Sequence, residues 1–385
     1  MSARFGEKAG AARRLFQAAG EETRSRLPSR ESIVRNIKAW ESGRHQPKDP
    51  YRVLYCRVFG MPEAALFGVE DRRGVGRPPT VVPAFPISPS HHVAPELVDY
   101  FRLQLLSHYT ADAFLGPHHL LGVVTAQYRS ITKLADQAKG ELHRELLRLG
   151  AGFAAFAGWL YQDAGVIDQA ALWLDMNLEM AHRAQDIQLT SHALTNKAML
   201  AADLGDASVV IDLTAAALSN SDRLMPKARV LALQQGAHGY ALASDRGRCD
   251  ALLDEAAALI DDIDDDHLWG NACRTPHYVE IQRATCYGRL GLTSEAATLW
   301  DEVILSVPTA SRRDIGVFLA RQATALAALP EPERAAEAAR KAIEFLHKTG
   351  SVRQQAELAI MPTRMGAWAD TAVGREVTEM PAGVT

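Results

Sequence analysis

Apolar residues recur three and four positions apart through most of this chain, which is the spacing of amphipathic helices. From residue 95 onward the sequence is rich in Ala, Leu, Glu, Gln and Arg and has no run of alternating β-branched residues. We therefore expect helices and no sheet. Short breaks in the helical pattern recur at Gly165, Gly205, Gly247, Gly291 and Pro330. They are 40, 42, 44 and 39 residues apart, which predicts a repeating array of helix pairs.

Three of these breaks are followed, five residues later, by an alanine: Ala170, Ala296 and Ala335. A small side chain at that position would let the second helix of a pair approach the first closely. The helix-turn-helix units resemble tetratricopeptide-type repeats, and GRLGLTSEAATLWDEVI at 288–304 is the best match. The alternative for this region is a generic α-helical bundle.

A separate helical pattern lies near the N-terminus. Ser29 can cap a helix that runs to about Ser42, and Ile33, Ile37 and Trp40 form an apolar stripe on one side of it with Val34 beside them. A second helix begins at Asp49-Pro50 and carries the apolar residues Tyr51, Leu54, Tyr55, Val58 and Phe59.

Six prolines between residues 69 and 95 interrupt the helical pattern and predict a linker. The sequence thus predicts an all-α protein with an N-terminal helical module at 1–68, a Pro-rich linker at 69–95 and a helical repeat array at 96–368. Residues 369–385 lack an apolar period and predict a disordered tail. A length of 385 residues also favours more than one core.

Charge divides the chain in the same way. Residues 1–80 carry 16 Lys and Arg against 9 Asp and Glu, a net charge of +7, while the whole chain has a net charge of −4. A cationic module on an anionic body is typical of proteins whose module binds a polyanion. A solvated basic surface is the alternative.

The string WESGR followed by Pro47 resembles the end of the recognition helix in Cro/C1-type helix-turn-helix regulators. Residues 28–60 as a whole, together with YFRLQLLSHYTADAFLGPHHLLGVV and FAGWLYQDAG in 96–185, resemble actinobacterial transcriptional regulators that join this module to a tetratricopeptide-like array. The resemblance implies a DNA-binding regulator whose helix 29–42 enters the major groove of double-stranded DNA.

The resemblance also implies roles for individual residues of the module. We expect contacts to base edges from Arg30, Ser32, Arg35 and Asn36. We expect contacts to phosphates from Arg26, Lys38, Arg44 and Lys48. We expect structural roles for Trp40, Glu41 and Gly43.

The family's module has one more helix on its N-terminal side than residues 1–68 supply. We therefore expect the module to be truncated, with the true start upstream of Met1. The alternative is a repeat-array interaction scaffold that has lost DNA binding because this first helix is absent.

Other chemistry finds little support in the sequence. No nucleotide-binding glycine motif, no HExxH and no GxSxG occurs, so we expect no enzyme activity and no cofactor. The spacing of His267, Cys273, His277 and Cys286 fits no compact zinc site, and the acidic run at 261–266 fits a solvated loop better than a calcium site. We expect no metal.

The array is the remaining candidate for binding. Aromatic residues near the helix junctions are expected to fill the core, although some could line a groove for a peptide, a protein or a small effector, and the array could also mediate self-association as a homodimer. Four irregularly spaced cysteines and the lack of an apolar stretch of about 20 residues predict a cytoplasmic protein without a membrane partner.

Overall fold

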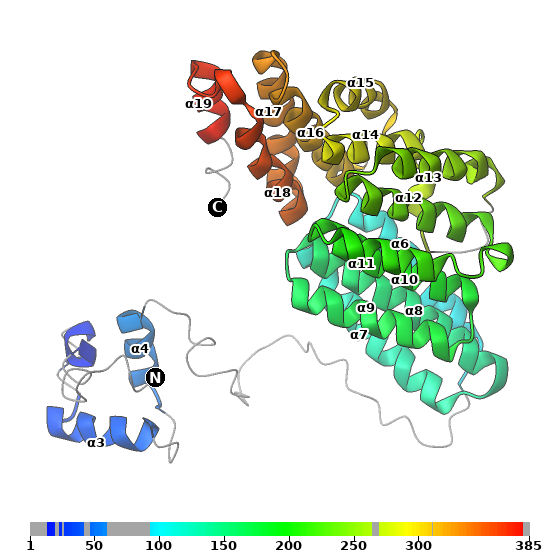
Figure 1. Cartoon of the computed structure of the whole chain (residues 1–385). Coiled ribbons are helices and arrows are strands. Elements are labelled where there is room, and N and C mark those ends of the chain that lie inside the picture. The colour runs from blue at the N-terminus through cyan, green and yellow to red at the C-terminus, as the bar shows by residue number, and fades with distance from the viewer. Residues whose placement is uncertain are drawn as a thin grey trace. The chain divides into compact units, whose positions relative to one another are not determined.

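The computed structural model of the protein describes residues 14–19, 23–24, 27–41, 47–59, 93–263, 269–309 and 311–379. The chain forms two compact units, Met1–Pro89 and Ser90–Thr385, which we call the module and the array (Figure 1). Within the described ranges all regular secondary structure is helical, with no strand. The predicted all-α fold class is confirmed. Most of the predicted linker lies outside the described residues.

The described part of the module includes the helices α3 (Arg30–Glu41) and α4 (Tyr51–Phe59) and a helical stretch at 14–18. The Ser29 hydroxyl oxygen accepts a hydrogen bond from the backbone N–H of Ser32 at 3.3 Å, so the predicted cap begins the helix. The small core of the module consists of Leu15, Ala19, Ile33, Ile37 and Leu54. The apolar stripe predicted from the sequence therefore lies in this core.

The array is a succession of antiparallel helices, which Figure 1 shows stacked side by side. Its longer helices are α6 (Glu96–Asp112), α7 (Pro117–Gln137), α8 (Gly140–Asp163), α9 (Ile167–Arg183), α10 (Ile187–Asp203), α11 (Ala207–Ala217), α12 (Pro226–Leu242), α13 (Arg246–Leu259), α14 (Tyr278–Leu290), α15 (Thr293–Val303), α16 (Arg312–Ala327), α17 (Pro332–Thr349), α18 (Val352–Ile360) and α19 (Ala372–Glu379). Short 3₁₀ turns join them: η2 (Ser221–Arg223), η3 (Ile260–Asp262), η4 (Asn271–Arg274), η5 (Ile304–Ser306), η6 (Met361–Arg364) and η7 (Gly366–Trp368).

Five helical hairpins form the centre of the array: α8/α9, α10/α11, α12/α13, α14/α15 and α16/α17. Three of them turn at a glycine with positive φ: Gly165 (+74°), Gly205 (+78°) and Gly291 (+76°). At Gly165 the N–H of the following residue, Val166, donates to the carbonyl of Tyr161 at 2.9 Å, the pattern of a Schellman turn. The same bond recurs after Gly205, from Asp206 to Ala201 at 3.0 Å.

One predicted break is misplaced. Gly247 lies inside α13, and the turn before that helix is made by Ser244, whose φ is +61°. The Asp245 N–H closes this turn onto the carbonyl of Tyr240 at 2.9 Å. A serine here occupies a conformation that glycine adopts more easily, so a search for glycines moved the break three residues downstream.

The residue five positions after each turn is buried in every hairpin. Ala170, Ala296 and Ala335 are fully buried as predicted, and the equivalent positions in the other two hairpins are Val210 and Cys249, which are also fully buried. Gly158 of α8 also lets α9 approach closely, because a Cβ at this position would lie only 2.7 Å from a methyl group of Leu174. Small side chains thus let the two helices of a hairpin pack closely.

The core of the array consists of two large apolar clusters and two small ones, which contain Val210 and Ala170 respectively. The two large clusters follow one another along the chain. One runs from α6 to α14 and the other from α14 to α19, and α14 contributes to both through Cys286 and Tyr287 respectively. Aromatic residues mostly fill these cores, as expected. Trp173, Trp269, Tyr278 and Tyr287 are buried, while Trp159, Tyr161 and Tyr240 are half-buried.

The C-terminal segment differs from the prediction. Residues 369–379 were expected to be part of a disordered tail, but Ala372–Glu379 forms α19, which contacts α17. Val377 is buried against the second core cluster, and Arg340 of α17 binds Glu376 through a 3.0 Å ion pair. Only two apolar residues, Val373 and Val377, anchor this helix, which is too short a pattern to detect in the sequence. Residues 380–385 lie outside the described part.

Candidate nucleic-acid interface and array interior

Helix α3 presents two different faces. Ile33 and Ile37 are fully buried, and Trp40 packs against the rings of Tyr51 at 4.9 Å and Tyr55 at 6.1 Å between centroids. This packing fixes α3 on α4 and determines which side chains remain outside. Trp40 thus packs in the interface between the two helices.

The opposite face of α3 is polar and open. Arg35 is exposed, and Ser32 and Asn36 are partly exposed. Arg35 donates to the Ser32 hydroxyl at 3.2 Å, which brings these two side chains together. An exposed guanidinium beside a hydroxyl and an amide is the kind of set that can read base edges.

The other predicted contacts are placed only in part. Lys48 is exposed in the turn before α4. Arg30, Lys38 and Glu41 belong to α3, but their side chains lie outside the described part, as do Arg26, Gly43 and Arg44 altogether.

Two arginines that the sequence did not single out hold the module together. Arg24 donates to the carbonyls of Ala19 at 2.9 Å and Gln17 at 3.3 Å, and Arg57 of α4 donates to the carbonyl of Ala18 at 3.4 Å. Both cations thus bind carbonyl oxygens at the end of the helical stretch 14–18, where such groups lack intrahelical partners. Part of the module's positive charge is structural.

The array has a second polar region, which the sequence did not reveal. We call it the interior network: Asp203 of α10, His238 of α12, Arg289 of α14, Arg321 of α16, and Arg353 and Glu357 of α18. The arginine and carboxylate side chains of this network are 12 to 24% exposed. These helices contact one another in succession, which is why residues far apart in sequence meet here.

Ion pairs and hydrogen bonds connect the interior network. Arg353 Nε lies 3.1 Å from Asp203 Oδ2, and Arg321 Nε lies 2.7 Å from Glu357 Oε1. Arg289 Nη2 is 3.8 Å from Asp203 Oδ1, and its Nη1 donates to His238 Nδ1 at 2.7 Å. Burial alone would raise the pKa of Asp203, but Arg353 and Arg289 lower it below its usual value. Asp203 is therefore ionised at neutral pH.

A buried contact joins the two ends of the array. We call it the closure contact. Asp112 at the end of α6 accepts from the indole N–H of Trp159 at 3.0 Å and from Arg313 of α16, and Ser351 donates to Asp163 of α8 at 2.6 Å. Two guanidinium groups lie over the Trp159 ring, with that of Arg313 4.8 Å and that of Arg353 4.7 Å from its centroid.

The closure contact is tight as well as polar. A side chain at Gly116, in the turn between α6 and α7, would collide with the carbonyl of Thr349. The closure contact thus links residues about 190 to 200 positions apart.

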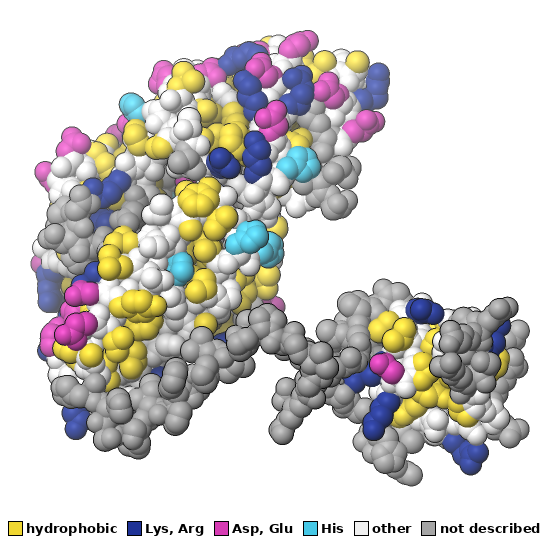
Figure 2. All heavy atoms as spheres, turned by 180° about the vertical axis from the view of Figure 1, so that it is seen from behind, with side chains coloured by type: hydrophobic (Ala, Val, Ile, Leu, Met, Phe, Trp, Pro, Cys, Tyr) yellow, Lys and Arg dark blue, Asp and Glu magenta, His cyan; other side chains and the backbone are white. Residues whose placement is uncertain are grey.

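Several surface charges of the array's C-terminal helices are paired. Figure 2 shows positive and negative side chains interleaved over the C-terminal helices, and the pairs there include Arg334 with Asp301 at 2.6 Å and Lys341 with Glu337 at 2.6 Å. Exposed pairs of this kind contribute little to stability. On the face that Figure 2 shows, these helices carry mixed charge of both signs.

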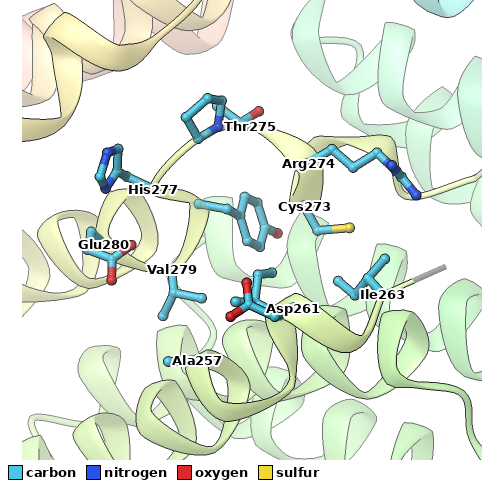
Figure 3. Close-up of a pocket in the computed structure, with 12 residues that line it drawn as sticks. Ala257, Asp261, Ile263, Cys273, Arg274, Thr275, His277, Val279 and Glu280 are labelled. Atoms are coloured by element: carbon cyan, nitrogen blue, oxygen red, sulfur yellow. The ribbon is translucent and has the colours of Figure 1, made fainter. Parts of the chain in front are cut away.

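A pocket of about 450 Å³ lies between the end of α13 and the start of α14 (Figure 3). Its lining includes Asp261, Cys273, His277 and Glu280. The Cys273 thiol donates to the carbonyl of Gly270 at 3.0 Å. Ile263, at the end of the described segment that precedes residue 264, also lines it.

Three of the four residues weighed for zinc lie within the described part of the chain, at two different places. His277 lines the pocket beside Cys273, whereas the Cys286 thiol lies 3.4 Å from Nδ1 of His238 in the interior network; His267 is outside the described part. Across the described ranges no group of three His, Cys, Asp or Glu side chains is arranged to hold a metal ion. All four cysteines are free thiols.

No helix within the described residues combines the length and apolarity needed to cross a membrane. Neither a protein-family model nor a curated protein matches this chain.

Proposed function

We propose that this protein is a DNA-binding transcriptional regulator whose module reads double-stranded DNA through α3. One observation carries the proposal. The apolar side chains of α3, Ile33 and Ile37, are buried in the module core, while Arg35 and its neighbour Ser32 lie on the solvent-exposed side. A helix held in this way can enter a major groove with its polar side chains toward the bases. The net charge of +7 over residues 1–80 supports the proposal, because it provides attraction to phosphates.

The array would then bind a peptide, protein or small effector, or mediate self-association. Its interior network supports this part of the proposal, because polar and charged side chains are concentrated there instead of apolar ones. We place the protein in the cytoplasm, where free thiols such as its four cysteines remain reduced. We do not propose a catalytic activity.

The proposal is tested by selecting duplexes from a random pool with the full chain and measuring affinity for the selected duplex against salt concentration. Each phosphate contact contributes a slope of about −0.9 in a plot of log K against log salt, so several contacts give a steep loss of affinity. Arg144, also exposed but located in the array and bound to Glu141, provides the matched control for Arg35. Arg35→Ala should weaken binding and Arg144→Ala should not.

The alternative is an interaction scaffold that has lost DNA binding. The structural use of Arg24 and Arg57 favours it, because cations bound to carbonyl oxygens have fewer donors left for phosphates. In that case the selection would retain no duplex above background, and Arg35→Ala would behave like Arg144→Ala.

A further inference from the structure

The interior network holds more positive than negative charge. Three guanidinium groups, on Arg289, Arg321 and Arg353, share two carboxylates, on Asp203 and Glu357. Their side chains are only 12 to 24% exposed, so water screens this excess weakly. A partly buried cation without a full counter-charge is unfavourable, and binding of an anion would relieve it.

The excess charge can be assigned to Arg289. Arg321 is 2.7 Å from Glu357, and Arg353 is 3.1 Å from Asp203. Among the described residues, the carboxylate that pairs with Arg289 is that of Asp203, and it is 3.8 Å away. The Asp203 oxygen nearest Arg353 is shared with the side-chain amide of Gln162, which donates to it at 2.6 Å.

The second partner of Arg289 carries no charge. His238 accepts from Arg289 at Nδ1, and its Nε2 lies 2.9 Å from the side-chain oxygen of Gln282, to which it donates. Burial, and next the Arg289 guanidinium, hold the pKa of His238 well below its usual value, so the imidazole is neutral. It orients Arg289 without neutralising it.

The charges around Arg289 agree with the assignment of the excess positive charge to this residue. Burial, and next the neighbouring Arg321 guanidinium, lower the pKa of Arg289. The carboxylates of Asp203 and Glu357 act in the opposite direction and do not cancel the effect. The site is therefore positive, and two guanidinium groups contribute to it from adjacent helices, α14 and α16.

We propose that Arg289, with Arg321 beside it, binds the carboxylate group of a small organic acid in the interior of the array. A guanidinium donates two parallel hydrogen bonds to a carboxylate, which matches both its shape and its single charge. A phosphate monoester carries a charge of about −1.5 to −2 at neutral pH and would reverse the excess. The inference deepens and rests on the effector-binding role proposed for the array, and it is independent of DNA binding.

The test uses the full chain and acetate, the simplest probe with this group. Sodium chloride is replaced stepwise by sodium acetate at constant ionic strength, and the midpoint of thermal unfolding is recorded. A ligand that binds only the folded state raises this midpoint as its concentration rises. Sodium phosphate at the same ionic strength is a second arm of the experiment.

Two variants should change the acetate-dependent rise of the unfolding midpoint in opposite directions. Arg289→Gln removes the excess charge, so the acetate-dependent rise should vanish and the acetate Kd from calorimetry should weaken at least about tenfold. Asp203→Asn increases the excess, so it should enlarge the acetate-dependent rise. Arg334→Gln, at an exposed arginine that already binds Asp301, should leave the response of the unaltered chain unchanged.

The proposal is overturned if acetate does not stabilise the unaltered chain, or if it stabilises the Arg289→Gln variant equally. A larger rise with phosphate than with acetate, dependent on Arg289, would overturn the assignment to a carboxylate. No DNA is present in these experiments, so each of these results leaves the proposal for α3 standing.

Discussion

Replacing Asp112 with asparagine tests the closure contact of the array. Asp112 and Arg313 are paired with side chains only 5% and 9% exposed. Burial would lower the pKa of Arg313, but Asp112, Asp314 and Asp163 together raise it, so the guanidinium stays charged. Asp112→Asn keeps the shape of the side chain and leaves Arg313 without its principal counter-charge.

The structure sets the size of the expected effect. Removing one partner of a buried ion pair costs about 3 to 5 kcal/mol. The lower end applies here, because Asp314 remains 3.6 Å from Arg313 and the negative charge of Asp163 also acts on it. We expect the free energy of unfolding of the array to fall by about 3 kcal/mol, which is a large part of the 5 to 15 kcal/mol typical of a folded domain.

Urea unfolding followed by circular dichroism at 222 nm measures this loss. Asp301→Asn is the matched control, because Asp301 is 44% exposed where it pairs with Arg334, and such pairs contribute about 0 to 1 kcal/mol. Hydrogen exchange should show that α6 and α16 lose protection together, since the closure contact joins them. A loss for Asp112→Asn no larger than that of the control would refute the reasoning.

Two further predictions concern the core of the module and the buried histidines. Ile37→Ala should destabilise the module by about 2 to 5 kcal/mol, because Ile37 is 1% exposed; hydrogen exchange in α3 would report it, and unchanged protection would contradict the assignment of this core. Burial, and next Lys227, lower the pKa of His192 from 6.5 to about 3. Because the unfolded chain takes up this proton first, the free energy of unfolding should fall below pH 6.5 by up to about 1.4 kcal/mol per pH unit from this residue. Urea unfolding from pH 7 to pH 4 should show that the unfolding free energy depends less on pH in His192→Gln, by the contribution of one proton. An equal pH dependence in both proteins would contradict the burial of a neutral imidazole.

Local sequence patterns were sufficient to predict that the array consists of paired helices. The glycines at 165, 205 and 291 mark real turns, because each adopts a positive φ that other residues avoid. Ala170, Ala296 and Ala335, which lie five residues after three of the predicted breaks, are buried where paired helices approach closely. Ser244 shows the limit of the method, since a neighbouring turn can use a residue that carries no strong turn signal.

The interior network and the closure contact could not be predicted in the same way. Arg289 and Arg313 each lie in helices whose local sequence resembles a solvated amphipathic surface. What buries them is the meeting of α14 and α16 with α10 and α6, and in particular the pairing of Arg313 with a residue 201 positions away. Helical periodicity assigns a residue to a face of its own helix, but it contains no information about which distant helix covers that face.

The sequence predicted the buried side of α3 in the module but not the roles of the module's arginines. The stripe of α3 follows from a spacing of three and four residues, and the structure buries Ile33 and Ile37 and packs Trp40 against them. The roles of the cations do not follow from spacing. Arg24 and Arg57 bind backbone carbonyls while Arg35 is open, and this difference depends on where the helical stretch 14–18 ends.

The most direct test of the central proposal is the affinity of the full chain and of Arg35→Ala for the selected duplex and for each of its single base-pair variants. If α3 reads base edges through Arg35, the substitution should weaken binding by about 5- to 150-fold, or about 1 to 3 kcal/mol, and abolish discrimination at one base pair while leaving it intact elsewhere. If Arg35→Ala binds every duplex as tightly as the unaltered chain does, α3 does not read DNA through this face.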